Sequence, residues 1–265
     1  MMKTDWLIRL CSGVVYIGLV LYAIFASSII FHILMIIFST LCLWEFFVFS
    51  KMQAILIKKI MVFVALSMLV ELINRIRGSD PTVGLIIFPI MYFTSELFSK
   101  AIPIEKVQQL SQVFFGWIYI GVPFFLARHL YAFHDQGKNL IIGLFILIWV
   151  NDTLAYLVGH WWGKKKLAPS VSPKKTVEGF LGGLFSCLVC SLIFYKIWGE
   201  WYWFMIGLIV AVFGTLGDLV ESVIKRAYGV TNSGKFFPGH GGFLDRLDSF
   251  IFVIPMVVSY FVLFV

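Results

Sequence analysis

The sequence predicts an all-α fold: a polytopic integral membrane protein of about nine transmembrane helices with a polar site on the cytoplasmic side. Three observations lead to this class. Of the 265 residues, 60% are hydrophobic and only 13% are charged, whereas a soluble domain is about half apolar and a quarter charged. The apolar residues form runs close to the roughly 20 residues that a helix needs to cross a bilayer. Most basic residues lie in short loops between these runs, as is typical of polytopic membrane proteins.

Nine apolar segments are expected to be helices. Turn residues separate several of them, including Pro81 and Pro103, because proline does not continue a helix. The unusual polar motifs all lie in the second half, so we divide the chain into N-terminal transmembrane helices, 1–138, and a C-terminal catalytic transmembrane region, 139–265. The expected segments are 8–26, 30–49, 58–74, 82–98, 110–127, 139–158, 178–197, 201–218 and 249–265.

The basic residues predict an orientation. With nine crossings, the side that holds the N-terminus carries 16 of the 21 Lys and Arg residues. Cytoplasmic loops carry the excess of these residues, so we expect a cytoplasmic N-terminus and an outward C-terminus in a bacterial inner membrane. Lys3 and Arg9 precede the first apolar run, but no A-x-A cleavage pattern ends it, so it is expected to remain as a helix.

The formal charge of +7 does not indicate nucleic-acid binding, because the cations lie in the short loops. The cysteines do not suggest a disulfide framework. Cys187 and Cys190 form a CxxC, but inside the apolar run LFSCLVCSLIF, where packing is the expected role.

A first polar cluster lies at the end of the eighth segment. Its spacing of i, i+3, i+4 and i+7 places all members on one face of a helix. The alternative is a solvated face with an internal ion pair, but acids beside a membrane span are usually functional. The cluster consists of Asp218, Glu221, Ser222 and Lys225.

A second motif is FFPGHGGFLDRLDS, residues 236–249. Its glycines, among them Gly241 and Gly242, allow backbone N–H groups to approach a phosphate. Asp245 and Asp248 are three residues apart, so they can share a helix face and bind Mg²⁺, which takes oxygen ligands. The alternative is a Gly-rich turn followed by an acidic helix start.

A third motif is SPKKTVEGFLGG, residues 172–183. Ser172 is expected to cap a helix with Pro173 in its first turn. Lys174 and Lys175 would then stand at a helix N-terminus, which favours anions; the alternative is ordinary positive-inside charge. Three glycines are expected to permit close helix contact: Gly179, Gly182 and Gly183.

A fourth motif places Asp152 one turn before Tyr156, and an intramembrane Asp indicates function by default. His160, beside two tryptophans, is expected to be a membrane-boundary residue. Three further acids lie in or beside apolar segments, and the sequence leaves open whether they make buried polar contacts or line a lipid channel: Glu45, Glu71 and Glu96.

These motifs resemble those of the phosphatidate cytidylyltransferase (CDP-diacylglycerol synthase) family. S-x-x-K-R in Ser222–Arg226 and P-G-H-G-G-x-x-D-R-x-D in Pro238–Asp248 are similar to its signature, and SPKKTVEG and GDLVES are similar to two further blocks. The resemblance is dense over residues 151–249. One departure is Thr231-Asn232, where the family usually has Lys-Asp, so a role of that pair in charge balance or metal binding is in doubt.

The resemblance implies that CTP and phosphatidic acid give CDP-diacylglycerol and pyrophosphate, with Mg²⁺, alone or with a second metal ion, as cofactor. It implies a metal held by Asp218 and Asp245, with Glu221 and Asp248 as ligands or neighbours of ligands. It implies that Ser222 and His240 support the site by hydrogen bonding. It further implies that a larger set of residues contacts the phosphates or other parts of the substrates: Asp152, Lys174, Lys175, Glu178, Lys225, Arg226, His240, Gly241, Gly242 and Arg246.

Two other functions stay open at this point. An ion-coupled transporter would also carry intramembrane acids, but near the midplane and in both halves. Another nucleotide-dependent lipid enzyme, acting for example on an isoprenoid alcohol, would have a related site. The expected partners are CTP, phosphatidic acid and membrane lipid, without nucleic acid, and a homodimer is left open.

Overall fold

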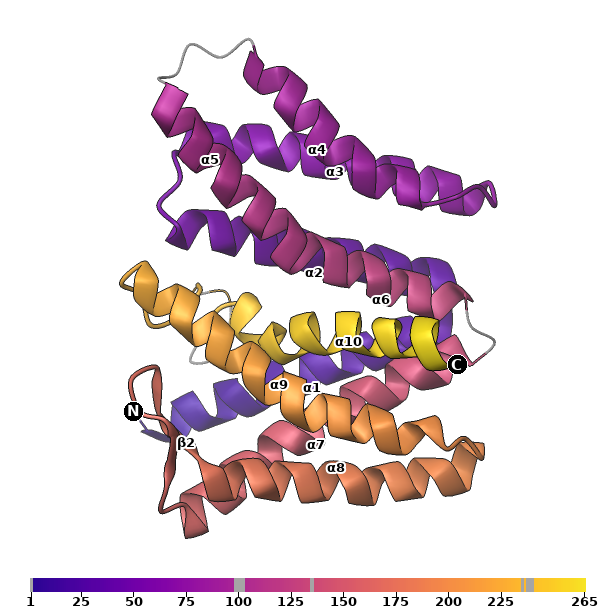
Figure 1. Cartoon of the computed structure of the whole chain (residues 1–265), viewed down its shortest axis with the longest axis vertical. Coiled ribbons are helices and arrows are strands. Elements are labelled where there is room, and N and C mark those ends of the chain that lie inside the picture. The colour runs from indigo at the N-terminus through magenta and orange to yellow at the C-terminus, as the bar shows by residue number, and fades with distance from the viewer. Residues whose placement is uncertain (1, 98–102, 134–135, 235, 237–240) are drawn as a thin grey trace. The chain divides into compact units, whose positions relative to one another are not determined.

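The computed structural model describes the chain except residues 1, 98–102, 134–135, 235 and 237–240. The described part is nearly all helical (Figure 1). It forms two compact units: residues 1–128 with 233–244, and residues 129–232 with 245–265. The short segment 233–244 therefore belongs with the N-terminal helices, although it lies late in the sequence.

The first unit is built from helices in chain order. Ser27 caps the second of them, because its hydroxyl accepts a hydrogen bond from the backbone N–H of Ile30 at 3.1 Å. A five-residue π-helical stretch joins the last two, and the last continues into the second unit. The elements are α1 (Met2–Ala26), α2 (Ser28–Phe49), α3 (Ala54–Ile76), α4 (Thr82–Leu97), α5 (Pro103–Gly116), η1 (Trp117–Gly121) and α6 (Val122–Phe133).

The three acids that the sequence left open all make buried polar contacts in this unit. Glu71 accepts hydrogen bonds from the guanidinium of Arg128, one of them at 2.8 Å from Nε. The carboxylate of Glu96 lies 2.6 Å from the ammonium of Lys59. Glu45 accepts its hydrogen bonds from the segment 233–244. Pairing of this kind offsets the cost of burying a charge.

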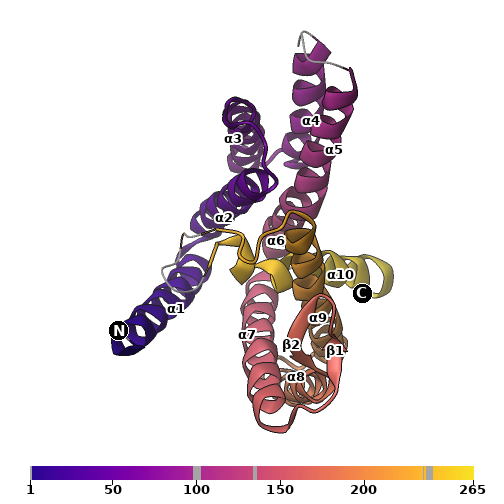
Figure 2. The same ribbon diagram turned by 90° about the vertical axis from the view of Figure 1, so that its left-hand side faces the viewer.

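The second unit consists of four long helices, a hairpin and most of a short 3-10 helix, whose first residue, Leu244, belongs to the first unit. The hairpin lies where the first of these helices ends and the next begins (Figures 1 and 2). Gly199, at φ +80°, ends the second long helix in the left-handed conformation that glycine adopts readily. The elements are α7 (Gly137–Trp162), β1 (Lys166–Ala168), β2 (Ser172–Thr176), α8 (Val177–Trp198), α9 (Tyr202–Ala227), η2 (Leu244–Arg246) and α10 (Asp248–Phe264).

Glycines allow α7 and α8 to approach closely, as predicted. A Cβ on Gly179 would lie 2.6 Å from the carbonyl oxygen of Ala155, and one on Gly182 would lie 2.6 Å from Val158. A Cβ on Gly183 would lie 2.5 Å from Oδ1 of Asn151. Any larger residue would therefore force the two helices apart.

The helices are those of an integral membrane protein. Among the described residues, five are long and apolar enough to cross a membrane: Ser28–Phe49, Val107–Ala132, α7, α8 and α9. Each of the nine predicted segments contains or overlaps a helix. The count of nine spans is not confirmed, because several of the helices are shorter than the width of a bilayer requires.

The predicted helix start at Ser172 is wrong. Ser172 and Pro173 lie in strand β2, which pairs antiparallel with β1. The cap is Thr176, whose hydroxyl accepts a hydrogen bond from the N–H of Gly179 at 3.1 Å. Threonine caps almost as well as serine, and proline is tolerated at the start of an edge strand, so the local sequence suits both arrangements. Lys174 and Lys175 consequently project from a strand, and the all-α class holds apart from this hairpin.

Candidate active site

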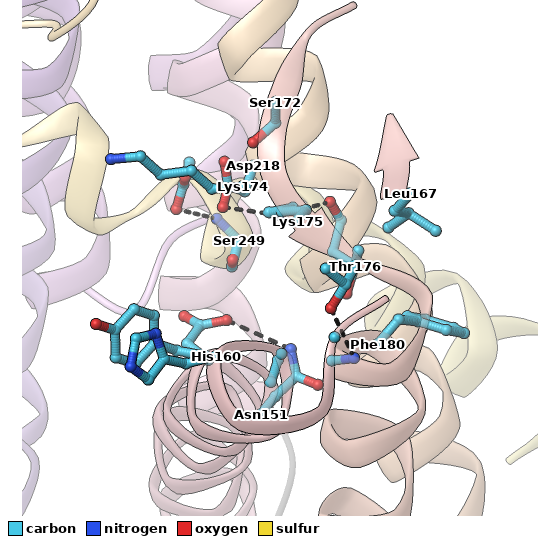
Figure 3. A pocket seen from close by; sticks show the side chains of 18 of the residues that line it. Asn151, His160, Leu167, Ser172, Lys174, Lys175, Thr176, Phe180, Asp218 and Ser249 are labelled. Atoms are coloured by element: carbon cyan, nitrogen blue, oxygen red, sulfur yellow. Dashed lines mark hydrogen bonds and ion pairs between the residues drawn. The ribbon is translucent and has the colours of Figure 1, made fainter. Parts of the chain in front are cut away.

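A pocket of about 810 Å³ lies in the second unit, between the hairpin and helices α7, α8, α9 and α10. Figure 3 shows Lys174, Lys175 and Asp218 on one side of it and Asn151 and His160 on the other. The charged residues come from six different elements. Those that line the pocket are Asp152, Lys166, Lys174, Lys175, Asp218, Asp245, Arg246 and Asp248.

Helix α9 presents the predicted polar face. The helix runs on to Ala227, so Asp218, Glu221, Ser222 and Lys225 share one side of it. The hydroxyl of Ser222 donates to Oδ1 of Asp218 at 3.4 Å. Asp218 lines the pocket, whereas Glu221 is 1% exposed. The face therefore has an accessible carboxylate and a buried one.

Lys225 connects this face of α9 to Asp245. Its ammonium lies 2.7 Å from Oε2 of Glu221 and 2.6 Å from Oδ1 of Asp245. The internal ion pair of the alternative interpretation is therefore present, but it extends to a third residue. The other oxygen of Glu221 is buried without a hydrogen-bond donor among the described residues. Because a buried charge that loses its partner is costly, this arrangement fixes the position of Asp245.

Lys175 forms a second, more exposed connection. Its ammonium lies 2.8 Å from Oδ2 of Asp218 and 3.3 Å from the carbonyl oxygen of Thr215 (Figure 3). The side chains of Lys175 and Asp218 are 24% and 39% exposed. The contact thus connects strand β2 to helix α9 at the wall of the pocket.

Carboxylates gather at the base of the pocket. Asp248 begins α10, and its Oδ1 accepts a hydrogen bond from the N–H of Ser249 at 2.7 Å. The negative charges of Glu221, Asp218 and Asp152 act on it. Asp152 accepts a hydrogen bond from the amide of Asn151 at 3.3 Å. Negative charges that act on one another in this way repel unless cations lie among them.

Cations from the hairpin and from η2 balance this negative charge. The charges of Lys175 and Arg246 both act on Asp152. Lys174 and Lys166 also line the pocket. Cations at several points of one cavity can bind a chain of phosphates, so the pocket suits a polyanion.

The carboxylate oxygens of the pocket are ligands of the kind that Mg²⁺ takes, since this ion is commonly held by one or two carboxylates with substrate phosphates. In this structure Asp218 is paired with Lys175 and Asp245 is paired with Lys225. Within the described residues, no three Asp, Glu, His or Cys side chains are arranged as a ready-made metal site.

Several residues implied by the family resemblance lie outside the pocket lining. Glu178 accepts hydrogen bonds from the N–H groups of Lys164 and Lys165 at 3.0 and 3.2 Å, which holds the entrance to the hairpin. The guanidinium of Arg226 donates to the carbonyl oxygen of Val230 at 3.0 Å. Both residues support the backbone around the site.

The glycine-rich motif divides between described and undescribed residues. Gly241 and Gly242 belong to the first unit. His240 is a predicted supporting residue that lies outside the described residues.

Two aromatic rings complete the pocket and were not predicted as a pair. Tyr156 and His160 are stacked, with centroids 5.9 Å apart and planes at 12°, and both line the cavity. His160 was expected to be a boundary residue. A spacing of four residues from Asp152 to Tyr156 and again to His160 puts all three on one stripe of α7, a signal that the sequence contained. Asn151 and Ser249 also line the pocket without having been predicted.

Fold and site together define a helical integral membrane protein with a charged pocket suited to a phosphorylated ligand. The Cytidylyltransferase family model matches residues 7–264. The chain therefore belongs to the cytidylyltransferase family.

Similar proteins share a segment of this chain. A phosphatidate cytidylyltransferase of Staphylococcus aureus (strain COL) is 46% identical over 143 residues, which cover 52% of this chain and 54% of the relative. Proteins of the same name from Staphylococcus saprophyticus and Staphylococcus epidermidis are 45% identical over 144 residues and 41% identical over 143 residues, with the same coverage. The chain thus matches these relatives over about half of their length.

Proposed function

We propose that the protein is a phosphatidate cytidylyltransferase, which makes CDP-diacylglycerol and pyrophosphate from CTP and phosphatidic acid. The proposal rests on one observation. A single pocket is lined by acidic and basic residues together: Asp218, Asp245, Asp248, Lys175 and Arg246. These residues come from separate motifs of the sequence. The names of the staphylococcal relatives agree with this activity.

In the proposed reaction a phosphate oxygen of phosphatidic acid attacks the α-phosphorus of CTP. A new P–O bond forms, the bond from the α-phosphorus to the bridging oxygen breaks, and pyrophosphate leaves with that electron pair. The second ionisation of a phosphate monoester lies near pH 6, so the nucleophile is already an anion at neutral pH. The site therefore needs no strong general base, and its task is to bring two anions together.

The cations of the pocket perform this task. Lys174 and Lys175 on the strand, and Arg246 at the end of η2, would bind the phosphates of CTP and stabilise the charge that grows on pyrophosphate. Lys225 is held by Glu221 and Asp245, so we assign it to orienting Asp245. Ser222 supports Asp218 through its hydroxyl.

We propose that Asp218, Asp245 and Asp248 hold Mg²⁺. When bound, the ion would neutralise the phosphates and polarise the α-phosphoryl group. Asp218 is the ligand most easily recruited, because its ion pair with Lys175 is half-exposed and such pairs contribute only about 0–1 kcal/mol. Lys175 would then be released to bind a phosphate. Asp152, which also lines the pocket, would add negative charge that attracts the cation.

The stacked rings of Tyr156 and His160 provide the natural place for the base. A pyrimidine stacked on an aromatic ring gains about 1–3 kcal/mol. Both rings lie on the same stripe of α7 as Asp152, and so at the edge of the charged region. CTP would therefore extend from the rings to the cations.

The proposal is tested with purified protein, CTP, Mg²⁺ and a panel of acceptors. Phosphatidic acid should give CDP-diacylglycerol and one equivalent of pyrophosphate. A lipid acceptor such as an isoprenoid alcohol, at the same concentration, should give no product. Turnover of the alcohol in preference to phosphatidic acid would assign the chain to a different lipid enzyme.

We further propose that the N-terminus and the pocket face the cytoplasm of a bacterial inner membrane, where CTP is available. The distribution of basic residues supports this orientation. A reporter that works only on the outer side of the membrane should be active when it is fused after Val265, and a reporter that works only in the cytoplasm should be inactive there. A cytoplasmic signal from this fusion would mean that the number of crossings is even.

A further inference from the structure

Glu45 is a buried carboxylate that the proposed reaction does not use. It lies on α2 and is 8% exposed, beside the fully buried Phe46 and Phe47. An acid within an apolar membrane helix is costly, and such residues usually have a function. Its hydrogen-bond donors therefore indicate its role.

One oxygen of Glu45 accepts hydrogen bonds from two residues that lie far from it in the sequence. The hydroxyl of Ser233 and the backbone N–H of Leu244 both donate to Oε2, each at 2.9 Å. Ser233 and Leu244 are the first and last residues of the segment 233–244, which belongs to the same unit as Glu45. The carboxylate thus fastens both ends of this segment to α2.

Two glycines make room for this carboxylate. A Cβ on Gly242 would collide with Oε2 of Glu45 and with the hydroxyl of Ser233, and a Cβ on Gly234 would collide with the carboxylate of Glu45. Gly242 belongs to the P-G-H-G-G motif. Its lack of a side chain is therefore required by Glu45, whether or not a phosphate is bound.

An aromatic contact holds the same segment independently. The ring of Phe38, two turns before Glu45 on α2, meets the ring of Phe243 edge to face at 4.8 Å between centroids. Phe243 is next to Leu244, so a polar and an apolar contact act on the same end of the segment. Edge-to-face pairs of this kind stabilise packing beyond the area that they bury.

We propose that Glu45 is a positioning residue of the active site, an inference that rests on the proposed function. Leu244 is the first residue of η2, and the next two residues are Asp245 and Arg246. Fixing the N–H of Leu244 therefore fixes the start of η2, the short turn of backbone that carries both residues. Misplacement of reacting groups by about 1 Å lowers turnover by about 100-fold, so a distant anchor can control the rate.

The test compares graded variants at Glu45. Glu45→Gln keeps an acceptor oxygen but loses the charge, and Glu45→Met keeps the volume but loses the acceptor. Because hydrogen bonds to charged groups are stronger than neutral ones, we expect kcat to fall by roughly 10-fold in the first variant and by roughly 100-fold in the second. KM for CTP should change by less than about threefold, since Glu45 does not touch the substrate.

A second readout does not depend on activity. Hydrogen exchange of the backbone N–H of Leu244, followed by mass spectrometry of the full-length protein in lipid nanodiscs, should be faster by at least about 10-fold in Glu45→Met. Glu96→Gln is the matched control, because Glu96 is an equally buried acid of the same unit that pairs with Lys59 instead. It should change neither the exchange of Leu244 nor kcat.

A third variant supports the test if Glu45→Met fails to fold. Ser233→Ala removes one of the two donors and should raise exchange and lower kcat by a smaller factor.

The outcomes separate the two proposals. Faster exchange at Leu244 with unchanged kcat in Glu45→Met or Ser233→Ala would overturn the positioning role. Unchanged exchange in these variants would overturn the anchor itself. If the natural protein makes no CDP-diacylglycerol, the proposed function and the positioning role both fail, whereas the exchange data still decide whether the anchor exists.

Discussion

The ammonium of Lys175 lies 2.8 Å from the carboxylate of Asp218, so a residue of the hairpin is paired with a residue of α9 at the wall of the pocket. The exposure of both side chains makes this pair easy to open. The pair formed by Lys225 and Glu221 is buried, and breaking it would leave an uncompensated charge. One ion pair can therefore rearrange around a substrate, while the other holds the site together.

Asp218→Asn should reduce kcat by at least about 100-fold, because it removes a charge that the proposed Mg²⁺ site requires. The concentration of Mg²⁺ that gives half-maximal rate should rise. Thermal stability in detergent should change by less than about 1 kcal/mol, since the pair with Lys175 is partly exposed. Steady-state kinetics across a Mg²⁺ titration measure both effects, and activity like that of the natural protein would remove Asp218 from the metal site.

Lys225→Met should destabilise the protein by roughly 3–5 kcal/mol, because it leaves Glu221 buried and unpaired. The double variant Lys225→Met with Glu221→Gln should regain most of this stability. It should not regain activity, since Asp245 still lacks the ammonium that orients it. Thermal unfolding and CDP-diacylglycerol formation are measured on the same preparations. Recovery of activity together with stability would show that Lys225 has a structural role alone.

Tyr156→Ala should raise KM for CTP by roughly 5- to 100-fold, as expected for the loss of one base-stacking contact. Tyr156→Phe keeps the ring and should remain close to the natural protein. Trp161→Ala is the control, because Trp161 is exposed on the same helix and does not line the pocket. Equal effects of Tyr156→Ala and Trp161→Ala would indicate a general disturbance of α7 and would contradict base stacking.

Restoring the family's usual pair with Thr231→Lys and Asn232→Asp should change the apparent affinity for CTP or the Mg²⁺ requirement by about fivefold or less. Solvent-exposed charges contribute only about 0–1 kcal/mol, and both residues are exposed. Kinetics of the double variant beside the natural protein, at matched ionic strength, test this expectation. Activity that appears only in the double variant would mean that this chain has lost the family's reaction.

Local patterns explain what the sequence could predict. The polar face of α9 follows from a helical period, so Asp218 and Lys225 could be placed together before the structure was known. The hairpin could not be predicted in this way, because Ser172-Pro173 suits a helix start as well as a strand. The partners of Glu45 lie 188 and 199 residues away in the sequence. No local period records such a contact, so only the structure connects the first helices to the glycine-rich motif.

The most direct test of the central claim uses CTP labelled with ³²P at either the α- or the γ-phosphate, together with phosphatidic acid and Mg²⁺. Attack on the α-phosphorus should move the α-label into a lipid-soluble product and the γ-label into pyrophosphate. Asp248→Asn, measured beside the natural protein, should show neither transfer. A γ-label in the lipid, or the absence of a labelled lipid with purified and folded natural protein, would contradict the account.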